Sequence, residues 1–384
     1  MQSSDPGHFF ETDAQISLAA RRLSKKSNTH GTPIPLKSKL LASIPHPLSP
    51  SSVLIAESTG TIRHIDLLSP TTTNKTYRGP TTPISSLAAT STTLYAGCWD
   101  KTIWSWDLVT RKVGRKFEGH GDFVKALVVG KLNGRELLVS GGVDRKIIVW
   151  DLESGVRLHT LSDGVVNMMG VQSLVVDSVG GKEGEMVVVS ASSDPHIRRW
   201  RVTRDGWEQV VDAPDKEGEE RRTLLVHETT VYKLVVDEEE GDLWSGSGDG
   251  SVKCLARAKG WKEEERLVHG DHVRAVAVTG EWVVSAGRDE DIKFWDRGSG
   301  ELYCTLEGHY DEVTELVVLE GMGKVVSVSI DGTVRSWPLD RKALDAVVEE
   351  QKKVEEVEGE DKKPEGGLLS AEEEAELAAL MEDD

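Results

Sequence analysis

The sequence lacks the features of several protein classes. It has three cysteines, and an odd number without framework spacing argues against a secreted disulfide-rich scaffold. No CxxC pair and no His/Cys cluster with zinc spacing occurs. No apolar run reaches the ~18 residues that a membrane helix needs, and the opening MQSSDPGHFFETD does not resemble a signal peptide. We therefore expect a cytoplasmic or nuclear protein without a membrane, metal or cofactor partner.

Positive charge is also scarce. The 46 Lys and Arg residues face 65 Asp and Glu residues, which gives a net charge of −19. This balance argues against direct nucleic-acid binding or attachment to an anionic membrane. The charge is uneven, because Asp340–Asp384 holds 17 acidic and 6 basic residues, whereas the first 39 residues lean basic. Both ends therefore differ from the central body.

Phe and Tyr are rare, with five of each, but there are 11 Trp. The excess suggests one recurring structural position. A pattern of a β-rich run, a Ser/Gly turn and an Asp followed six residues later by Trp occurs at Asp100/Trp106, Asp144/Trp150, Asp194/Trp200, Asp289/Trp295 and Asp331/Trp337. Two further units fit with substitutions, at Asp249/Leu255 and Thr59/Ile65. The markers are 41, 44, 50, 55, 40 and 42 residues apart, which indicates seven repeats.

Each repeat contains short strand patterns broken by turns. LLVSGG followed by KIIVWDL and WVVSAG followed by IKFWD are typical. These runs are rich in Val, Ile and Trp, and Gly, Asp and Ser bound them. Because no amphipathic helix separates them, the repeats predict an all-β fold.

These residues resemble the WD-repeat family. Trp106-Asp107, Trp150-Asp151 and Trp295-Asp296 match its namesake dipeptide, and Gly119-His120 and Gly308-His309 match its Gly-His opening. The resemblance covers about residues 38–340 and implies a seven-bladed β-propeller with four strands per blade around a channel. A short N-terminal extension (residues 1–37) and an acidic, partly helical tail (residues 341–384) flank it.

The resemblance implies a buried hydrogen-bonded His, Ser, Asp and Trp quartet in each blade. It is complete in three blades: His120, Ser140, Asp144 and Trp150; His269, Ser285, Asp289 and Trp295; His309, Ser327, Asp331 and Trp337. A Ser-His-Asp catalytic triad is the alternative. The set recurs from blade to blade without a G-x-S-x-G motif, and the Gly-rich stretch at 245–250 does not precede a helix. We therefore expect no enzymatic activity.

The remaining blades are irregular. Blade 1 lacks both the Trp and the turn Asp, and blade 2 opens with Arg78-Gly79-Pro80 instead of Gly-His. In blade 4 we place Asn167 at the His position, with inserts near 177–185 and 204–222. These departures indicate either sequence divergence of the repeat without a functional role or a blade reshaped to bind a partner.

Ring closure requires a fourth strand for blade 7, which ends at Trp337-Pro338-Leu339. We expect the segment Phe10–Pro35 to supply it, although Ile16–Leu23 could equally begin a short helix.

Partners are expected on the face that carries the start of each first strand and the turn between the second and third strands. The residues before the turn Asp, and those beside the Val after each Gly-His, fall there. Aromatic, basic and histidine side chains at these positions make the candidate set Trp99, Phe123, Lys125, Tyr232, His272, Arg274 and Arg288. Trp99, Phe123 and Tyr232 could form an aromatic cage.

The acidic tail carries a second candidate. Ser370 and Glu373 form a capping box, so we predict a helix at 370–381. Leu377, Leu380 and Met381 give it an apolar stripe, which either docks on a partner or belongs to a solvated tail.

We predict a non-catalytic scaffold or adaptor subunit of a multiprotein complex, monomeric outside it. One alternative is a recognition module for a modified peptide, such as a histone tail or a degradation signal. Another is an RNA- or ribosome-associated assembly factor, which would need a local basic patch such as Arg198, Arg199 and Arg201.

Overall fold

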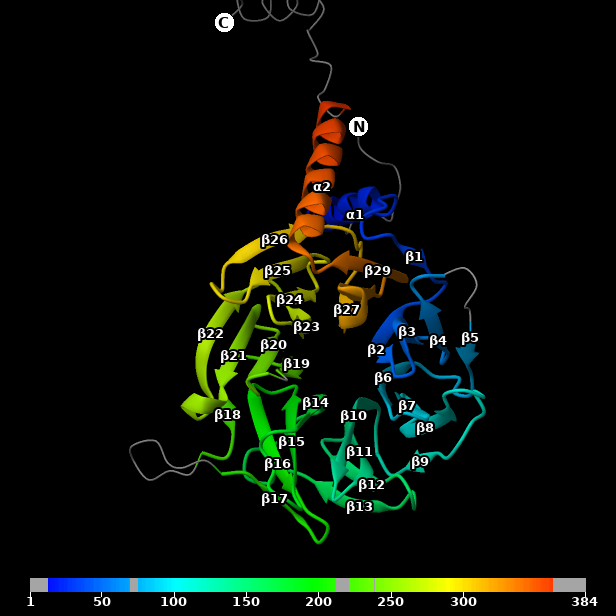
Figure 1. The fold of residues 1–384 in the computed structure, drawn as a ribbon, viewed down its shortest axis with the longest axis vertical. Helices are drawn as coiled ribbons and strands as arrows, with labels where there is room; N and C mark the ends of the chain where they lie inside the picture. The colour runs from blue at the N-terminus through cyan, green and yellow to red at the C-terminus, as the bar shows by residue number, and fades with distance from the viewer. Residues whose placement is uncertain (1–12, 70–74, 212–220, 238, 362–384) are drawn as a thin grey trace, which may run out of the picture. The chain divides into compact units, whose positions relative to one another are not determined.

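The computed structural model describes residues 13–69, 75–211, 221–237 and 239–361 (Figure 1). The chain divides into two compact units at the Asp340–Arg341 junction, and each is described by itself. Neither helix in these residues is long and apolar enough to cross a membrane.

The first unit is a ring of seven antiparallel sheets, here called blades 1 to 7 (Figure 1). Blade 1 consists of β2 (Leu40–His46), β3 (Ser49–Glu57), β4 (Ile62–Asp66) and β5 (Lys75–Tyr77). Blade 2 consists of β6 (Ile84–Ala89), β7 (Thr93–Cys98), β8 (Thr102–Asp107) and β9 (Phe117–Glu118), and blade 3 of β10 (Val124–Leu132), β11 (Arg135–Gly142), β12 (Ile147–Asp151) and β13 (Arg157–Leu161). Blade 4 consists of β14 (Val171–Asp177), β15 (Met186–Ser192), β16 (His196–Val202), β17 (Trp207–Gln209) and β18 (Leu224–Leu225).

The second half of the ring repeats this order. Blade 5 consists of β19 (Val231–Val236), β20 (Leu243–Ser247), β21 (Ser251–Ala256) and β22 (Lys262–Val268), with the 3-10 turn η2 (Arg257–Lys259) before its last strand. Blade 6 consists of β23 (Val273–Val278), β24 (Trp282–Gly287), β25 (Ile292–Asp296) and β26 (Leu302–Leu306). Blade 7 consists of β27 (Val313–Leu319), the 3-10 turn η3 (Glu320–Met322), β28 (Lys324–Ser329), β29 (Thr333–Pro338) and β1 (Ile34–Pro35). The seven-bladed propeller predicted from the repeat is confirmed.

The N-terminal segment closes the ring. β1 pairs antiparallel with β29, with Ile34 opposite Val334. The Ser336 and Leu36 amides extend the pairing by donating to the Gly31 and Gly332 carbonyls at 2.8 and 2.7 Å. The fourth strand of the last blade therefore comes from the opposite end of the chain, within the range Phe10–Pro35.

Helix α1 (Asp13–Lys25) precedes this strand and spans the alternative helix position at Ile16–Leu23. Its basic residues form ion pairs with carboxylates of blades 6 and 7. The pairs are Arg21 with Asp291 and Glu307, Arg22 with Glu290 and Asp311, and Lys25 with Glu290, Asp291 and Glu307. Lys25 and Glu290 are only 5% and 1% exposed, so part of this network is shielded from solvent.

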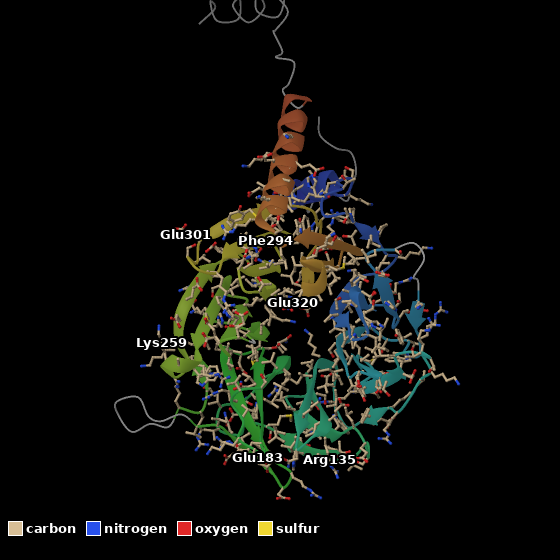
Figure 2. All side chains as sticks on the ribbon, in the orientation of Figure 1. Arg135, Glu183, Lys259, Phe294, Glu301 and Glu320 are labelled. Carbon is tan, nitrogen blue, oxygen red and sulfur yellow. The ribbon has the colours of Figure 1, made fainter. Side chains whose placement is uncertain are left out.

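The core lies between blades rather than in a single centre. Each apolar cluster joins two neighbouring sheets, as in the cluster around Trp200 between blades 3 and 4 and the cluster around Trp106 between blades 1 and 2. Figure 2 shows Phe294 within blade 6, whereas Arg135 and Glu301 lie at the rim. Because each sheet is covered on both sides, inner strands are continuous apolar runs instead of alternating ones.

Blade 4 departs most from the repeat. Its third strand, β16, pairs with two short strands, β17 along its second half and β18 along its first half. The predicted insert at 204–222 therefore interrupts the outer strand and leaves the inner strands in register.

The second unit contains helix α2 (Arg341–Asp361). The predicted helix at 370–381, with Leu377, Leu380 and Met381, lies outside the described residues.

Candidate partner-binding face at the channel mouth

The predicted quartets are hydrogen-bonded chains in the three regular blades. In blade 3, His120 joins Asp144 through Nδ1 at 3.0 Å and Ser140 through Nε2 at 2.8 Å. The Trp150 indole donates to the same Ser140 hydroxyl at 2.8 Å. Blade 7 repeats this pattern with His309, Ser327, Asp331 and Trp337, and blade 6 repeats it with the His269 ring reversed, so that Nε2 faces Asp289 and Nδ1 faces Ser285.

The quartets stabilise the turn that follows each second strand. Besides His120, the Asp144 carboxylate accepts hydrogen bonds from the Gly121 and Lys146 amides, at 2.8 and 3.3 Å. In blade 6, burial raises the pKa of Asp289, but the hydrogen bonds and charges of His269 and Lys293 outweigh it and lower this pKa to about 2. The turn aspartates are therefore anions held by several donors.

The geometry excludes a catalytic role for these serines. Ser140, Ser285 and Ser327 are fully buried. Each also accepts a tryptophan N–H, so its hydroxyl is already committed within the blade. A substrate carbonyl has no approach to such an oxygen.

Blade 4 corrects the predicted position of its missing histidine. Met169 donates its amide to Asp194 at 2.9 Å, as Gly121 does to Asp144, so Met168 and not Asn167 occupies the His position. Asp194 accepts instead from the fully buried Arg198 at 2.9 Å, and Asp163 accepts from the same guanidinium at 2.8 Å. The lost histidine is replaced by a buried ion-pair network.

Blade 2 uses another substitute that sequence reasoning missed. The Trp104 indole donates to Asp100 at 3.0 Å, in place of the absent histidine. Because Ala96 stands at the serine position, the Trp106 indole donates to the Arg78 carbonyl at 3.0 Å. The sequence feature that could have predicted this substitute is the additional tryptophan, Trp104, four residues after the turn residue Asp100.

One backbone hydrogen bond recurs at the same end of every blade. The residue after the second strand donates its amide to the carbonyl of the residue before or at the start of the first strand, at 2.8 to 3.1 Å. The seven bonds are Ser58 to Lys39, Trp99 to Pro83, Val143 to Phe123, Ser193 to Gly170, Gly248 to Thr230, Arg288 to His272 and Ile330 to Glu312. They bring the residues before each turn Asp and the residues at the start of each first strand together around the entrance of the central channel, here called the channel mouth.

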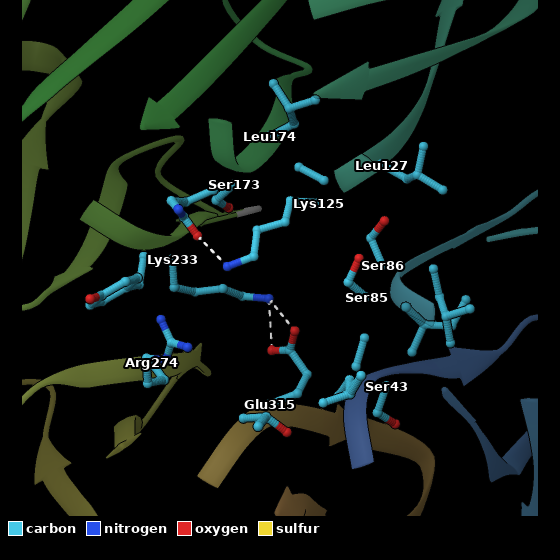
Figure 3. A pocket seen from close by; sticks show the side chains of 18 of the residues that line it. Ser43, Ser85, Ser86, Lys125, Leu127, Ser173, Leu174, Lys233, Arg274 and Glu315 are labelled. Carbon is cyan, nitrogen blue, oxygen red and sulfur yellow. Dashed lines mark hydrogen bonds and ion pairs between the residues drawn. The ribbon is translucent and has the colours of Figure 1, made fainter. Parts of the chain in front are cut away.

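The side chains at the channel mouth come from all blades. They surround a cavity of about 360 Å³, whose lining includes Leu41, Ser85, Lys125, Gln172, Tyr232, Arg274 and Thr314. Figure 3 labels Ser85, Lys125 and Arg274 among them. Within this lining, Lys233 binds Glu315 across the channel at 2.7 Å, and Lys125 donates to Gln172 at 3.0 Å. Burial, and then the charge of Arg274, lower the pKa of Lys125.

Two of the predicted anchors form an aromatic pair at the border of blades 2 and 3. The Trp99 and Phe123 rings are stacked with centroids 4.8 Å apart and planes 11° apart. Trp99 remains 40% exposed, although tryptophan is a residue that folding usually covers. A flat apolar surface is thus presented to solvent beside the channel.

A second group lies at the border of blades 5 and 6. The Arg274 guanidinium sits 4.2 Å from the Tyr232 ring centroid and pairs with Glu312, while His272 lies 6.3 Å from Tyr232. Arg288 pairs with Asp271 at 2.9 Å. Tyr232 therefore contacts a cation instead of joining Trp99 and Phe123 in one aromatic cage.

The arginine triplet of blade 4 does not form an exposed basic patch. Arg198 and Arg199 are buried, and Arg199 lies over the Trp261 ring. Arg201 pairs with Glu185 at 3.2 Å and with Glu208. This removes the local argument for an RNA-binding surface here.

Comparison with known proteins agrees with the fold. The family model for the WD domain, G-beta repeat, matches residues 71–107, 111–151, 263–296 and 300–338. A WD repeat-containing protein of Schizosaccharomyces pombe is 28% identical over the whole of both chains. Nuclear distribution protein nudF of Aspergillus niger is 26% identical over 65% of this chain and 57% of its own length. Pre-mRNA-processing factor 19 homolog 2 of Arabidopsis thaliana is 26% identical over 54% of this chain and 37% of its own.

The fold and the repeated quartet define a seven-bladed β-propeller whose channel mouth carries exposed aromatic and basic side chains. Four of its repeats match the WD-repeat family model, and its seven-bladed fold is that of a WD-repeat β-propeller. Propellers of this family generally serve as platforms for protein interactions and are typically not enzymes.

Proposed function

We propose that this protein is a non-catalytic adaptor subunit that binds a partner protein at the channel mouth, within a multiprotein complex of the cytoplasm or nucleus. The stacked pair of Trp99 and Phe123 carries this proposal. An exposed tryptophan held flat by a neighbouring ring offers a large apolar contact with little conformational entropy left to lose.

The charges at the channel mouth support a protein partner rather than a polyanion. Arg274 and Arg288 are already paired with Glu312 and Asp271. The rim is thus a mixture of apolar, aromatic and internally neutralised groups, as at protein interfaces. We expect a peptide segment to insert an apolar side chain beside Trp99 while polar groups contact Tyr232 and His272.

Two of the three described cysteines, Cys98 and Cys254, support the absence of thiol catalysis. Burial raises the pKa of Cys254 to about 12 and raises that of Cys98 further, so both are protonated at neutral pH. Neither supplies the thiolate that nucleophilic catalysis needs.

The names of relatives support the proposed setting. They refer to nuclear distribution and to pre-mRNA processing. We propose that the C-terminal segment around Leu377, Leu380 and Met381 is a second docking element.

The test is co-purification from the native cell with quantitative mass spectrometry. We expect Trp99→Ala combined with Arg288→Ala to lose at least one stoichiometric partner without a change in melting temperature. Trp207→Ala is the matched control, because Trp207 has a similar exposure of 37% on the outer strand β17. Retention of every partner by the double variant would discard the channel mouth as the binding face.

A further inference from the structure

A second cavity lies at the opposite end of the strands from the channel mouth, between blades 1 and 2. It measures about 350 Å³. Its walls come from the end of β2, the starts of β3 and β5, the end of β4, and the turn after β8. The titratable residues among its lining are His46, His64, Asp66, Lys75, Tyr77 and Arg111.

Two stacked imidazoles form one wall. The rings of His46 and His64 have centroids 4.3 Å apart and planes 25° apart. His46 is 8% exposed, and its Nδ1 accepts the Leu48 amide at 3.1 Å, which leaves the proton on Nε2. His64 Nε2 is buried and has no hydrogen-bond partner among the described residues. A buried polar atom without a partner is unusual in a folded protein and calls for a ligand.

Two cations flank the imidazoles. Lys75 is the cross-strand partner of His64, and Arg111 lies in the turn after β8. Neither side chain has an ion pair within the part of the chain that the structure describes, whereas the basic residues of α1 are all paired.

The one lining carboxylate, Asp66, lies near His64 and partly offsets the positive charges, but it is also held by its own turn. Asp66 Oδ1 accepts from the Ser51 hydroxyl at 2.8 Å and from the Leu68 amide at 3.1 Å, so it is committed to its own turn. Tyr77 is committed as well, because its hydroxyl donates to the Leu108 carbonyl at 3.0 Å.

The pKa shifts of the two histidines show that the cavity disfavours a further positive charge. Burial, followed by the proximity of His46 and Lys75, lowers the pKa of His64 to about 4. Burial and Lys75 also lower the pKa of His46. A third positive charge is therefore unfavourable here, and both a metal cation and a protonated imidazole would face repulsion from Lys75 and Arg111.

We propose that this cavity binds a phosphoryl group, with Lys75 and Arg111 as charged donors and the His64 and His46 ring N–H groups as neutral donors. Two cations and two neutral donors line this cavity, and a phosphate suits them because it can carry two negative charges and has more acceptor oxygens than a carboxylate. The site is independent of the channel mouth. The same chemistry could be presented by free phosphate or by a phosphorylated side chain of a partner.

The test is a titration of the full-length protein with inorganic phosphate and with a short phosphoserine peptide. Calorimetry measures the binding affinity, and the NMR shifts of the histidine ring protons report where the probe binds. Both readouts are repeated for Lys75→Ala combined with Arg111→Ala, whose side chains are at the surface. Lys112→Ala is the control, since Lys112 is an exposed neighbour outside the cavity.

We expect saturable binding that shifts the His46 and His64 resonances and weakens at least tenfold in the double variant, but not in Lys112→Ala. Tighter binding of the peptide than of phosphate would identify a phosphorylated partner, and equal binding would identify free phosphate. The proposal is overturned if neither probe binds, or if the double variant binds as well as the unaltered protein.

Discussion

At the scale of single residues, the turn aspartates show how one carboxylate organises a blade. Each accepts donors from a side chain and from turn amides, but the side-chain donor differs. It is His120 in blade 3, Trp104 in blade 2 and Arg198 in blade 4. A donor at the right place therefore matters more than its residue type, because a buried anion without donors is costly.

Removal of one such carboxylate should therefore destabilise the propeller. We expect Asp144→Ala to lower the free energy of unfolding by about 2–3 kcal/mol, since it leaves His120 and the Gly121 amide without their acceptor. Chemical denaturation measures the change. Asp205→Ala, at an exposed turn of blade 4, should stay within about 0.5 kcal/mol of the unaltered protein. Equal effects of the two changes would refute the role of the turn aspartate.

The same residues make stability depend on pH. Burial lowers the pKa of His309, so the stability it contributes is complete above its ordinary value near 6.5 and decreases as the pH falls below it. The donors of Asp289 lower its pKa to about 2, so its contribution is complete above about pH 4 and is lost as the pH falls toward 2. Both groups favour the folded state at neutral pH.

The urea midpoint should therefore decrease continuously from pH 7 to pH 3. Circular dichroism at fixed ionic strength measures it. A midpoint that stays constant or rises over this range would contradict the assignment of these donors and acceptors.

At the scale of elements, the sequence predicts the regular parts of the fold and misses the exceptions. Repeats with Asp and Trp six residues apart place the strands, because each blade repeats the same packing problem. Met168 could not be located from the sequence, since spacing alone does not distinguish it from its neighbour Asn167. For the segment of helix α1, the sequence left a helix and a strand as alternatives. The contacts that hold α1 are long-range ion pairs, which no local pattern reveals.

The attachment of α1 supplies a test at this scale. We expect Lys25→Ala to lower the free energy of unfolding by about 3 kcal/mol, because it leaves buried or half-buried carboxylates, Glu290 among them, short of a cation. Limited proteolysis should also cleave the N-terminal segment faster. The control is Lys26→Ala, whose side chain is exposed, and it should change neither measurement. Identical behaviour of both variants would mean that α1 does not fasten the ring closure.

At the scale of the whole molecule, the propeller provides two ends with different chemistry. The channel mouth gathers an exposed aromatic pair, internally neutralised arginines and a cavity. The predicted face positions converge there because a backbone hydrogen bond repeats in all seven blades. That Trp99 would stack on Phe123 while Tyr232 contacts Arg274 could not be predicted, since it depends on the side-chain geometry of neighbouring blades.

The most direct test of the account is hydrogen–deuterium exchange of the co-purified complex compared with the free protein. Binding at the channel mouth should slow exchange in residues 97–102, 121–125, 228–232 and 270–274, while the turns at 151–156 and 296–301 exchange unchanged. Protection confined to those opposite turns, or to none of the propeller, would contradict the proposal that partners bind at the channel mouth.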